Sequence, residues 1–165
     1  MRHADRPTAE EQIDVRASPE RIWPLVSDPG FLIATSPELV AVEWLAGCEG
    51  APATGCRFVG TNANKHFGQW QTISTVIECV APREFAWAVG DVDEPNTTWR
   101  FTLSPRADGT RVTQWMRLGS GPSGIGVAIG RMPDKEERIV ARRLDEFHAA
   151  MRANLEAIKT HAEQG

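Results

Sequence analysis

The sequence has 165 residues, of which 41% are hydrophobic, with 18 Lys and Arg against 22 Asp and Glu. This length and composition predict a globular domain with its own hydrophobic core, and they exclude intrinsic disorder. The net charge of −4 argues against nucleic-acid binding and against docking on an anionic membrane. The sequence contains no run of about 18 apolar residues, so we expect no membrane-spanning helix.

The N-terminal part predicts a tail and then a strand. Residues 1–9 are polar and lack the apolar core of a signal peptide, so we expect a disordered tail before one domain at 10–163, in a cytoplasmic protein. Residues 12–17 alternate apolar and polar side chains, as a half-buried strand does.

Two short helices are expected after this strand. At residues 18–20, Ser is a good N-cap, Pro suits the first helical position and Glu complements the helix dipole. Pro24 limits the first helix, and the Asp-Pro-Gly at 28–30 ends it. We expect residues 31–36 to form a second short helical segment.

Period-two patterning then predicts six more strands. They cover residues 39–46, 56–62, 70–80, 84–89, 97–103 and 110–118. A Gly-rich turn is expected at 47–55, and Asp108-Gly109 is a strong hairpin signal. Consecutive strands with short turns predict an antiparallel meander.

The C-terminal part predicts a long amphipathic helix. Residues 119–130 are Gly-rich and read as a long loop, or as a loop with a short helix. Asp134 and Glu137 have the spacing of a capping box. The apolar stripe that follows has helical spacing and consists of Val140, Leu144, Phe147, Met151, Leu155 and Ile158. This helix is the only large cover for the sheet, so a gap between the two layers would form a cavity.

Local motifs then carry a resemblance. Residues 13–23 (IDVRASPERIW), 78–87 (ECVAPREFAW), 98–103 (TWRFTL) and 108–113 (DGTRVT) resemble, in order and spacing, the SRPBCC (START-like, polyketide cyclase/dehydrase) superfamily over about residues 10–160. The chain is similar to its small, single-domain, actinobacterial type. The resemblance implies an α+β helix-grip fold: a curved seven-stranded antiparallel sheet wrapped around the C-terminal helix, with two short helices after the first strand.

The resemblance also implies a pocket for lipids, polyketides or other apolar molecules. Strand parity and the helical stripe give nine candidate ligand-binding residues: Phe58, Trp70, Trp87, Trp99, Phe101, Gln114, Met116, Phe147 and Met151. Each of these residues also fits ordinary core packing. Gln114 is the most informative, since a buried amide needs a polar partner or a ligand, unless a bulge turns it outward.

The candidates for catalysis are His66, Gln114 and Arg57, and they form no convincing constellation, so we leave enzymatic activity undecided. His66 also fits an exposed loop. No two His share metal-ligand spacing, so we expect no metal and no cofactor. The three cysteines, an odd number, are expected as reduced thiols.

Three functions remain open. The first is binding of a small hydrophobic or aromatic ligand by a monomer or homodimer, with residues 119–130 as a flap or a plain connector. The second is a polyketide cyclase/aromatase or a dehydratase that acts in the same cavity. The third is a protein-interaction module, which needs a large exposed apolar patch.

Overall fold

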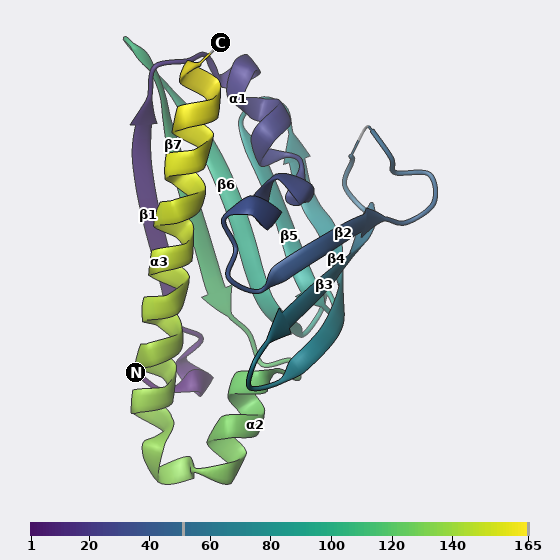
Figure 1. Cartoon of the computed structure of the whole chain (residues 1–165), viewed down its shortest axis with the longest axis vertical. Coiled ribbons are helices and arrows are strands. Elements are labelled where there is room, and N and C mark those ends of the chain that lie inside the picture. Colours follow the sequence, from purple (N-terminus) through teal and green to yellow (C-terminus); the bar gives the residue numbers. More distant parts are fainter. Residues whose placement is uncertain (51, 165) are drawn as a thin grey trace.

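Seven antiparallel strands form one sheet in the order β1-β7-β6-β5-β4-β3-β2 (Figure 1). The computed structural model describes residues 1–50 and 52–164, so residue 51, inside the predicted turn at 47–55, lies outside the described residues. The strands are β1 (Thr8–Val15), β2 (Leu39–Trp44), β3 (Arg57–Asn64), β4 (Gly68–Val80), β5 (Glu84–Gly90), β6 (Pro95–Arg106) and β7 (Gly109–Leu118). The predicted meander is confirmed from β2 to β7, and β1 returns to pair with β7.

The helices lie mostly at the two ends of the sequence. They are α1 (Pro19–Val26), α2 (Gly124–Arg131) and α3 (Glu136–Glu163), with the 3-10 segments η1 (His3–Asp5), η2 (Pro29–Ala34) and η3 (Pro133–Lys135). In Figure 1, α3 runs along β1 and β7 while the β2–β4 part of the sheet curls away from it. This is the helix-grip arrangement that the resemblance implies. None of the described helices is long and apolar enough to cross a membrane.

The β6–β7 hairpin shows why its turn needs glycine. Arg106 pairs with Gly109 at the end of the ladder, and Gly109 has a φ of 152°. A Cβ at Gly109 would collide with the backbone carbonyl oxygen of Val15. The close approach of the first strand therefore requires the glycine that the sequence places there.

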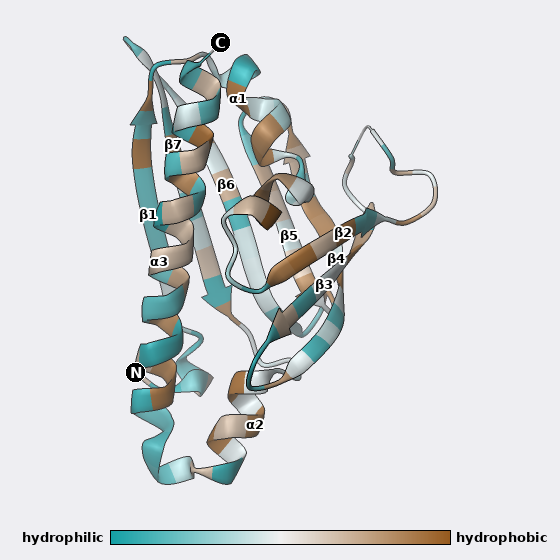
Figure 2. Cartoon of the chain, in the orientation of Figure 1, coloured by the Kyte–Doolittle hydropathy of each residue, from teal (hydrophilic) through white to brown (hydrophobic). Residues whose placement is uncertain are grey.

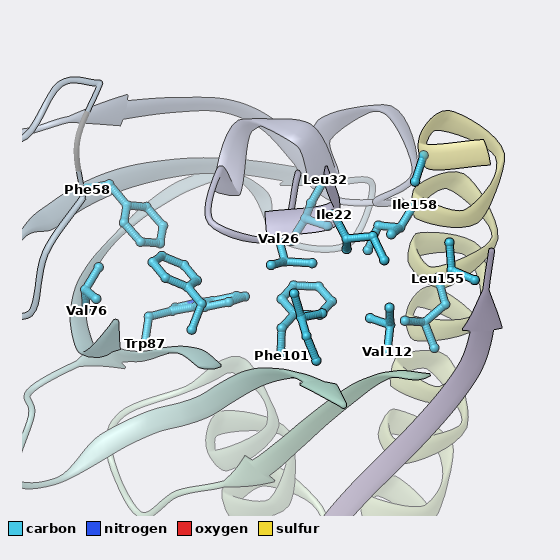
Figure 3. Packing of buried hydrophobic residues seen from close by; sticks show 14 residues of the cluster. Ile22, Val26, Leu32, Phe58, Val76, Trp87, Phe101, Val112, Leu155 and Ile158 are labelled. Atoms are coloured by element: carbon cyan, nitrogen blue, oxygen red, sulfur yellow. The ribbon is translucent and has the colours of Figure 1, made fainter. Parts of the chain in front are cut away.

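The core lies between the concave face of the sheet and the helices. Its larger cluster joins α1 and η2 to the sheet and to the C-terminal half of α3, through residues such as Ile22, Phe101 and Leu155 (Figure 3). A smaller cluster joins Met116 and Met151 nearer to α2. Figure 2 shows the corresponding pattern on α3, in which hydrophobic and hydrophilic residues alternate along the helix.

The structure differs from the sequence interpretation at the start of α3. The chain makes a 3-10 turn over Pro133–Lys135, and the N-cap of α3 is Lys135, which makes no side-chain capping bond. The capping box expected from Asp134 and Glu137 is therefore wrong, because Asp134 lies inside the turn. At α1 the expectation holds, since the Ser18 hydroxyl accepts a hydrogen bond from the backbone N–H of Arg21.

Two further differences concern the N-terminus and the cysteines. Residues 1–9, expected as a tail, include η1 and the start of β1, and Arg2 pairs with Glu136. Cys48 and Cys56 form a disulfide across the β2–β3 connection, which corrects the expectation of three reduced thiols. The two cysteines flank a turn between paired strands, so the hairpin brings them together.

Candidate functional site

The inner face of strands β5, β6 and β7 carries the predicted ligand-binding side chains opposite α3. Trp87 pairs with Trp99 across β5 and β6, and Trp99 pairs with Met116 across β6 and β7. Phe101 faces Gln114 one inner position further along. Because side chains two residues apart lie on one face of a strand, the sheet brings these residues together.

Three aromatic rings join the sheet to α3, and we call Trp87, Trp99 and Phe147 the aromatic bridge. The Trp87 and Trp99 rings stack, with centroids 6.3 Å apart and planes 12° apart. The Phe147 ring meets Trp99 edge to face at 5.2 Å. Trp99 and Phe147 are only partly buried, and the indole N–H of Trp99 donates to the Thr97 hydroxyl at 3.0 Å. The bridge therefore presents partly accessible apolar rings beside α3.

The remaining apolar candidates divide into core and edge. Phe101, Met116 and Met151 are at most 1% exposed. Phe58 is buried and lies 6.3 Å from Trp87. Trp70 is half-buried near the start of β4, where its ring meets that of Phe67. The structure thus places Phe58, Phe101, Met116 and Met151 within the packed core, as it does Trp87.

Gln114 points inward, as its strand parity predicts. Its side chain is 1% exposed, and its Oε1 accepts a hydrogen bond of 3.1 Å from Nδ2 of Asn154 on α3. The Oδ1 of Asn154 in turn accepts from the hydroxyl of Thr35, at the end of η2. We call Thr35, Asn154 and Gln114 the polar chain. Sequence reasoning missed Asn154, although a polar residue three positions after Met151, next to Leu155 on the apolar stripe, was a visible signal.

A charged cluster borders the aromatic bridge. Arg143 on α3 donates to Glu38, just before β2, with 3.1 Å between Nη2 and Oε1. Asn64 donates to the same carboxylate at 3.0 Å. The Arg143 guanidinium also lies 4.4 Å from the centre of the Phe147 ring and pairs with Glu146 at 2.8 Å. No local sequence pattern predicted this cluster, since Glu38 and Arg143 are 105 residues apart in the chain.

Burial and hydrogen bonding have opposite effects on the pKa values of Glu38 and Arg143. Burial acts to raise the pKa of Glu38, but the hydrogen bonds and charge of Arg143, with the hydrogen bond from Asn64, hold that pKa below its ordinary value. Burial acts to lower the pKa of Arg143, and its bonds to Glu38 and Glu146 outweigh this effect and raise it. Both groups are therefore charged at neutral pH.

The other two catalytic candidates lie away from Gln114. His66 is exposed in the β3–β4 turn, where its backbone N–H donates to Asn64 Oδ1. Arg57 is exposed on the outer face and lines a hollow of about 470 Å³. The structure does not bring His66, Gln114 and Arg57 together.

The space between sheet and helix, where we expected a cavity, is crossed by side chains. The aromatic bridge and the polar chain both run from the sheet to α3. Two surface hollows, of about 420 and 470 Å³, are lined by none of the nine predicted ligand-binding residues. A ligand between the sheet and α3 would therefore have to displace some of the side-chain contacts that now join these two layers.

The family described as "Polyketide cyclase / dehydrase and lipid transport" matches residues 6–163. The polyketide-cyclase-like protein Cgl2372 from Corynebacterium glutamicum is 26% identical, with a TM-score of 0.67, and the match covers 94% of this chain and 91% of that one. No curated protein matches the sequence.

Two more distant structures share the fold. The di-domain aromatase/cyclase StfQ, from the steffimycin biosynthetic pathway, is 14% identical with a TM-score of 0.70, and the match covers 95% of this chain and 51% of StfQ. Ara h 8.0201 is 12% identical with a TM-score of 0.60, and the match covers 96% of this chain and 99% of that one. At these identities the likeness concerns the fold alone.

Proposed function

Because the chain belongs to the polyketide cyclase / dehydrase and lipid transport family, we propose that it binds a small hydrophobic or aromatic molecule, lipid or polyketide-like, between the inner face of the sheet and α3. The aromatic bridge is the observation that supports this function. Trp99 and Phe147 offer apolar rings that the core only partly covers. A flat or aliphatic ligand that covers these rings gains the free energy of removing apolar surface from water.

Helix α2 is the part of the structure best suited to move aside for a ligand. None of its residues is buried, although Ile125 and Ile129 pack against the smaller core cluster. The segment before α2 is held to the sheet, since Gly119 and Gly121 donate to backbone oxygens of residues 95 and 96. This arrangement supports residues 119–130 as a flap hinged at its first residues, because elements with few buried contacts open at the lowest cost.

Binding is tested by titrating the protein with palmitic acid and with 1-naphthol, followed by calorimetry and by the fluorescence of its tryptophans. We expect saturable binding of at least one probe and a clear loss of affinity in Trp99→Leu. Trp115→Leu is the matched control, because Trp115 lies on the outer face between Arg100 and Arg117. Equal losses in the two variants, or no saturable binding by the wild type, would contradict the proposal.

Ring closure or dehydration of a polyketide-like substrate is the second candidate function. The observation that favours it is the ionised carboxylate of Glu38, held by Arg143, which itself contacts the aromatic bridge at Phe147. A carboxylate can remove the proton from a methylene between two carbonyls, the step that begins an aldol cyclisation. In this case Glu38→Gln abolishes turnover of a poly-β-ketone substrate and leaves binding intact, whereas a pure binding protein shows no turnover in either form.

A further inference from the structure

We infer that the end of the molecule that carries α2 is the interface of a homodimer, in which two copies of this chain meet about a two-fold axis. This interface lies outside the space between the sheet and α3, so it is independent of the proposed function. Four large hydrophobic side chains at this end are exposed to water, and we call them the apolar end. They are Phe67, Val92, Val127 and Met132, with exposed fractions of 57%, 50%, 51% and 39%.

Three segments bring the apolar end together. Phe67 lies in the β3–β4 turn and Val92 in the β5–β6 turn, and the other two members belong to α2 and its C-cap. In Figure 1 both turns and α2 lie at the same end of the molecule. A Cβ at Gly124 would lie 3.5 Å from the Phe67 ring, so this ring packs against the start of α2. Gly121 donates to the backbone oxygen of Pro95, which ties the segment before α2 to the β5–β6 turn.

The exposed face of α2 points away from the core. Ile125 and Ile129 pack against the smaller core cluster, and helical periodicity puts Val127 on the opposite face. Gly124 and Arg131, three and four residues from Val127, share this outward face. Exposed apolar residues that occur singly need no explanation, but a group of them shared by neighbouring segments is typical of an interaction surface.

The charges beside the apolar end differ in sign from one side to the other. The β5–β6 turn carries Asp91, Asp93 and Glu94, all exposed, and Arg131 is exposed at the far end of α2. Helix α2 begins beside this acidic turn, and Arg131 lies about 10 Å further along the helix axis. Within the described part of the chain, none of these four side chains takes part in an ion pair.

A surface with both signs of charge is complementary to a second copy of itself. A two-fold axis through Val127 brings the acidic turn of each copy towards Arg131 of the other, with the apolar side chains between them. An anionic membrane or a nucleic acid is a poorer partner, because the acidic turn repels it. The free edge of β2 is also less suited to a second copy, since a bulge between Leu39 and Ala41 interrupts its register and bulges hinder edge-to-edge pairing.

The first test is the molar mass as a function of concentration, measured by sedimentation equilibrium. We expect the wild type to pass from monomer to dimer between about 10 μM and about 1 mM, as a small interface predicts. Val127→Asp places a charge at the centre of the interface and should raise the dimer dissociation constant at least about tenfold. Val80→Asp is the matched control, because Val80 is 39% exposed at the opposite end of β4, and it should leave the constant unchanged.

Two charge reversals give a second readout. Arg131→Glu and Asp93→Lys should each raise the dimer dissociation constant about tenfold, because each variant then brings like charges together twice. An equimolar mixture of the two variants should associate about as tightly as the wild type, since both contacts of the mixed dimer then pair opposite charges. Both side chains are exposed, so circular dichroism and Tm should match those of the wild type.

Three results would overturn the inference. The first is a wild type that stays monomeric over the whole range of concentration, and the second is equal weakening by Val127→Asp and Val80→Asp. The third is a mixture of the charge variants that associates no better than either variant alone. Vesicles of phosphatidylcholine and phosphatidylglycerol form the last arm: if a monomeric wild type sediments with them and Val127→Asp does not, the surface belongs to lipid and the homodimer is ruled out.

Discussion

Replacing Arg143 with Met should show how strongly the charged cluster ties α3 to the segment before β2. The side chains of Arg143 and Glu38 are 30% and 22% exposed, so the pair is partly shielded from water. Leaving the Glu38 carboxylate without its main donor costs about 1–3 kcal/mol, and loss of the cation over Phe147 adds about 0.5–1 kcal/mol. We expect Arg143→Met to lower the free energy of unfolding by about 2–3 kcal/mol, and to lower Tm by roughly 4–12 °C for a chain of this size.

Urea unfolding and calorimetry measure this loss, and Arg142→Met is the matched control. Arg142 is the preceding residue on α3, its side chain is 80% exposed, and its contact with Glu146 is 3.5 Å. An exposed pair of this kind contributes no more than about 0.5 kcal/mol. The two arginine variants should therefore differ clearly, although each removes one positive charge from the same helix turn.

The pH dependence gives an independent check through Glu38→Gln. The pKa of Glu38 in the folded protein lies below its ordinary value of 4.5. The stabilisation by its charge is therefore complete above pH 4.5, and it is lost as the pH falls through the lowered pKa of the folded state. The stability difference between wild type and Glu38→Gln should narrow over this acidic range. Equal losses in Arg142→Met and Arg143→Met, or a difference that is constant from pH 7 to pH 3, would refute the reasoning.

Three other changes have expected outcomes for stability and thiol chemistry. Asn154→Leu removes the hydrogen-bond donor to the buried amide of Gln114 on β7, and it should lower the free energy of unfolding measured in urea by about 1–3 kcal/mol. Leu155→Ala leaves a cavity where a side chain only 2% exposed is now packed, and it should lower the free energy of unfolding by about 2–5 kcal/mol. An alanine substitution at an exposed position of α3 is the control and should leave that free energy nearly unchanged. Thiol titration in denaturant should find one thiol, Cys79, without reductant and three after reduction, and Cys48→Ser should lower stability by about 2–3 kcal/mol. Three reactive thiols without reductant would show that Cys48 and Cys56 are not joined.

Local periodicity in the sequence was enough to predict the fold class. Alternation of apolar residues predicted seven strands, and helical spacing from Val140 to Ile158 predicted the long helix that became α3. The motifs that resemble the SRPBCC superfamily then gave the helix-grip arrangement, which the sheet order confirms. These features depend on neighbours within a few residues, and so the sequence alone carries them. The same local reasoning failed at Asp134, where a 3-10 turn displaced the start of the helix.

Only the tertiary structure decided how the site is composed. Parity predicted that Gln114 faces inward, but its partner Asn154 is 40 residues away, and Glu38 is 105 residues from Arg143. The contact between Trp99 and Phe147 likewise joins a strand to a distant helix. Such contacts depend on the curl of the sheet and on where α3 crosses it, and no local pattern contains that information. The sequence therefore determined the layers, and their packing determined which polar and aromatic groups meet between them.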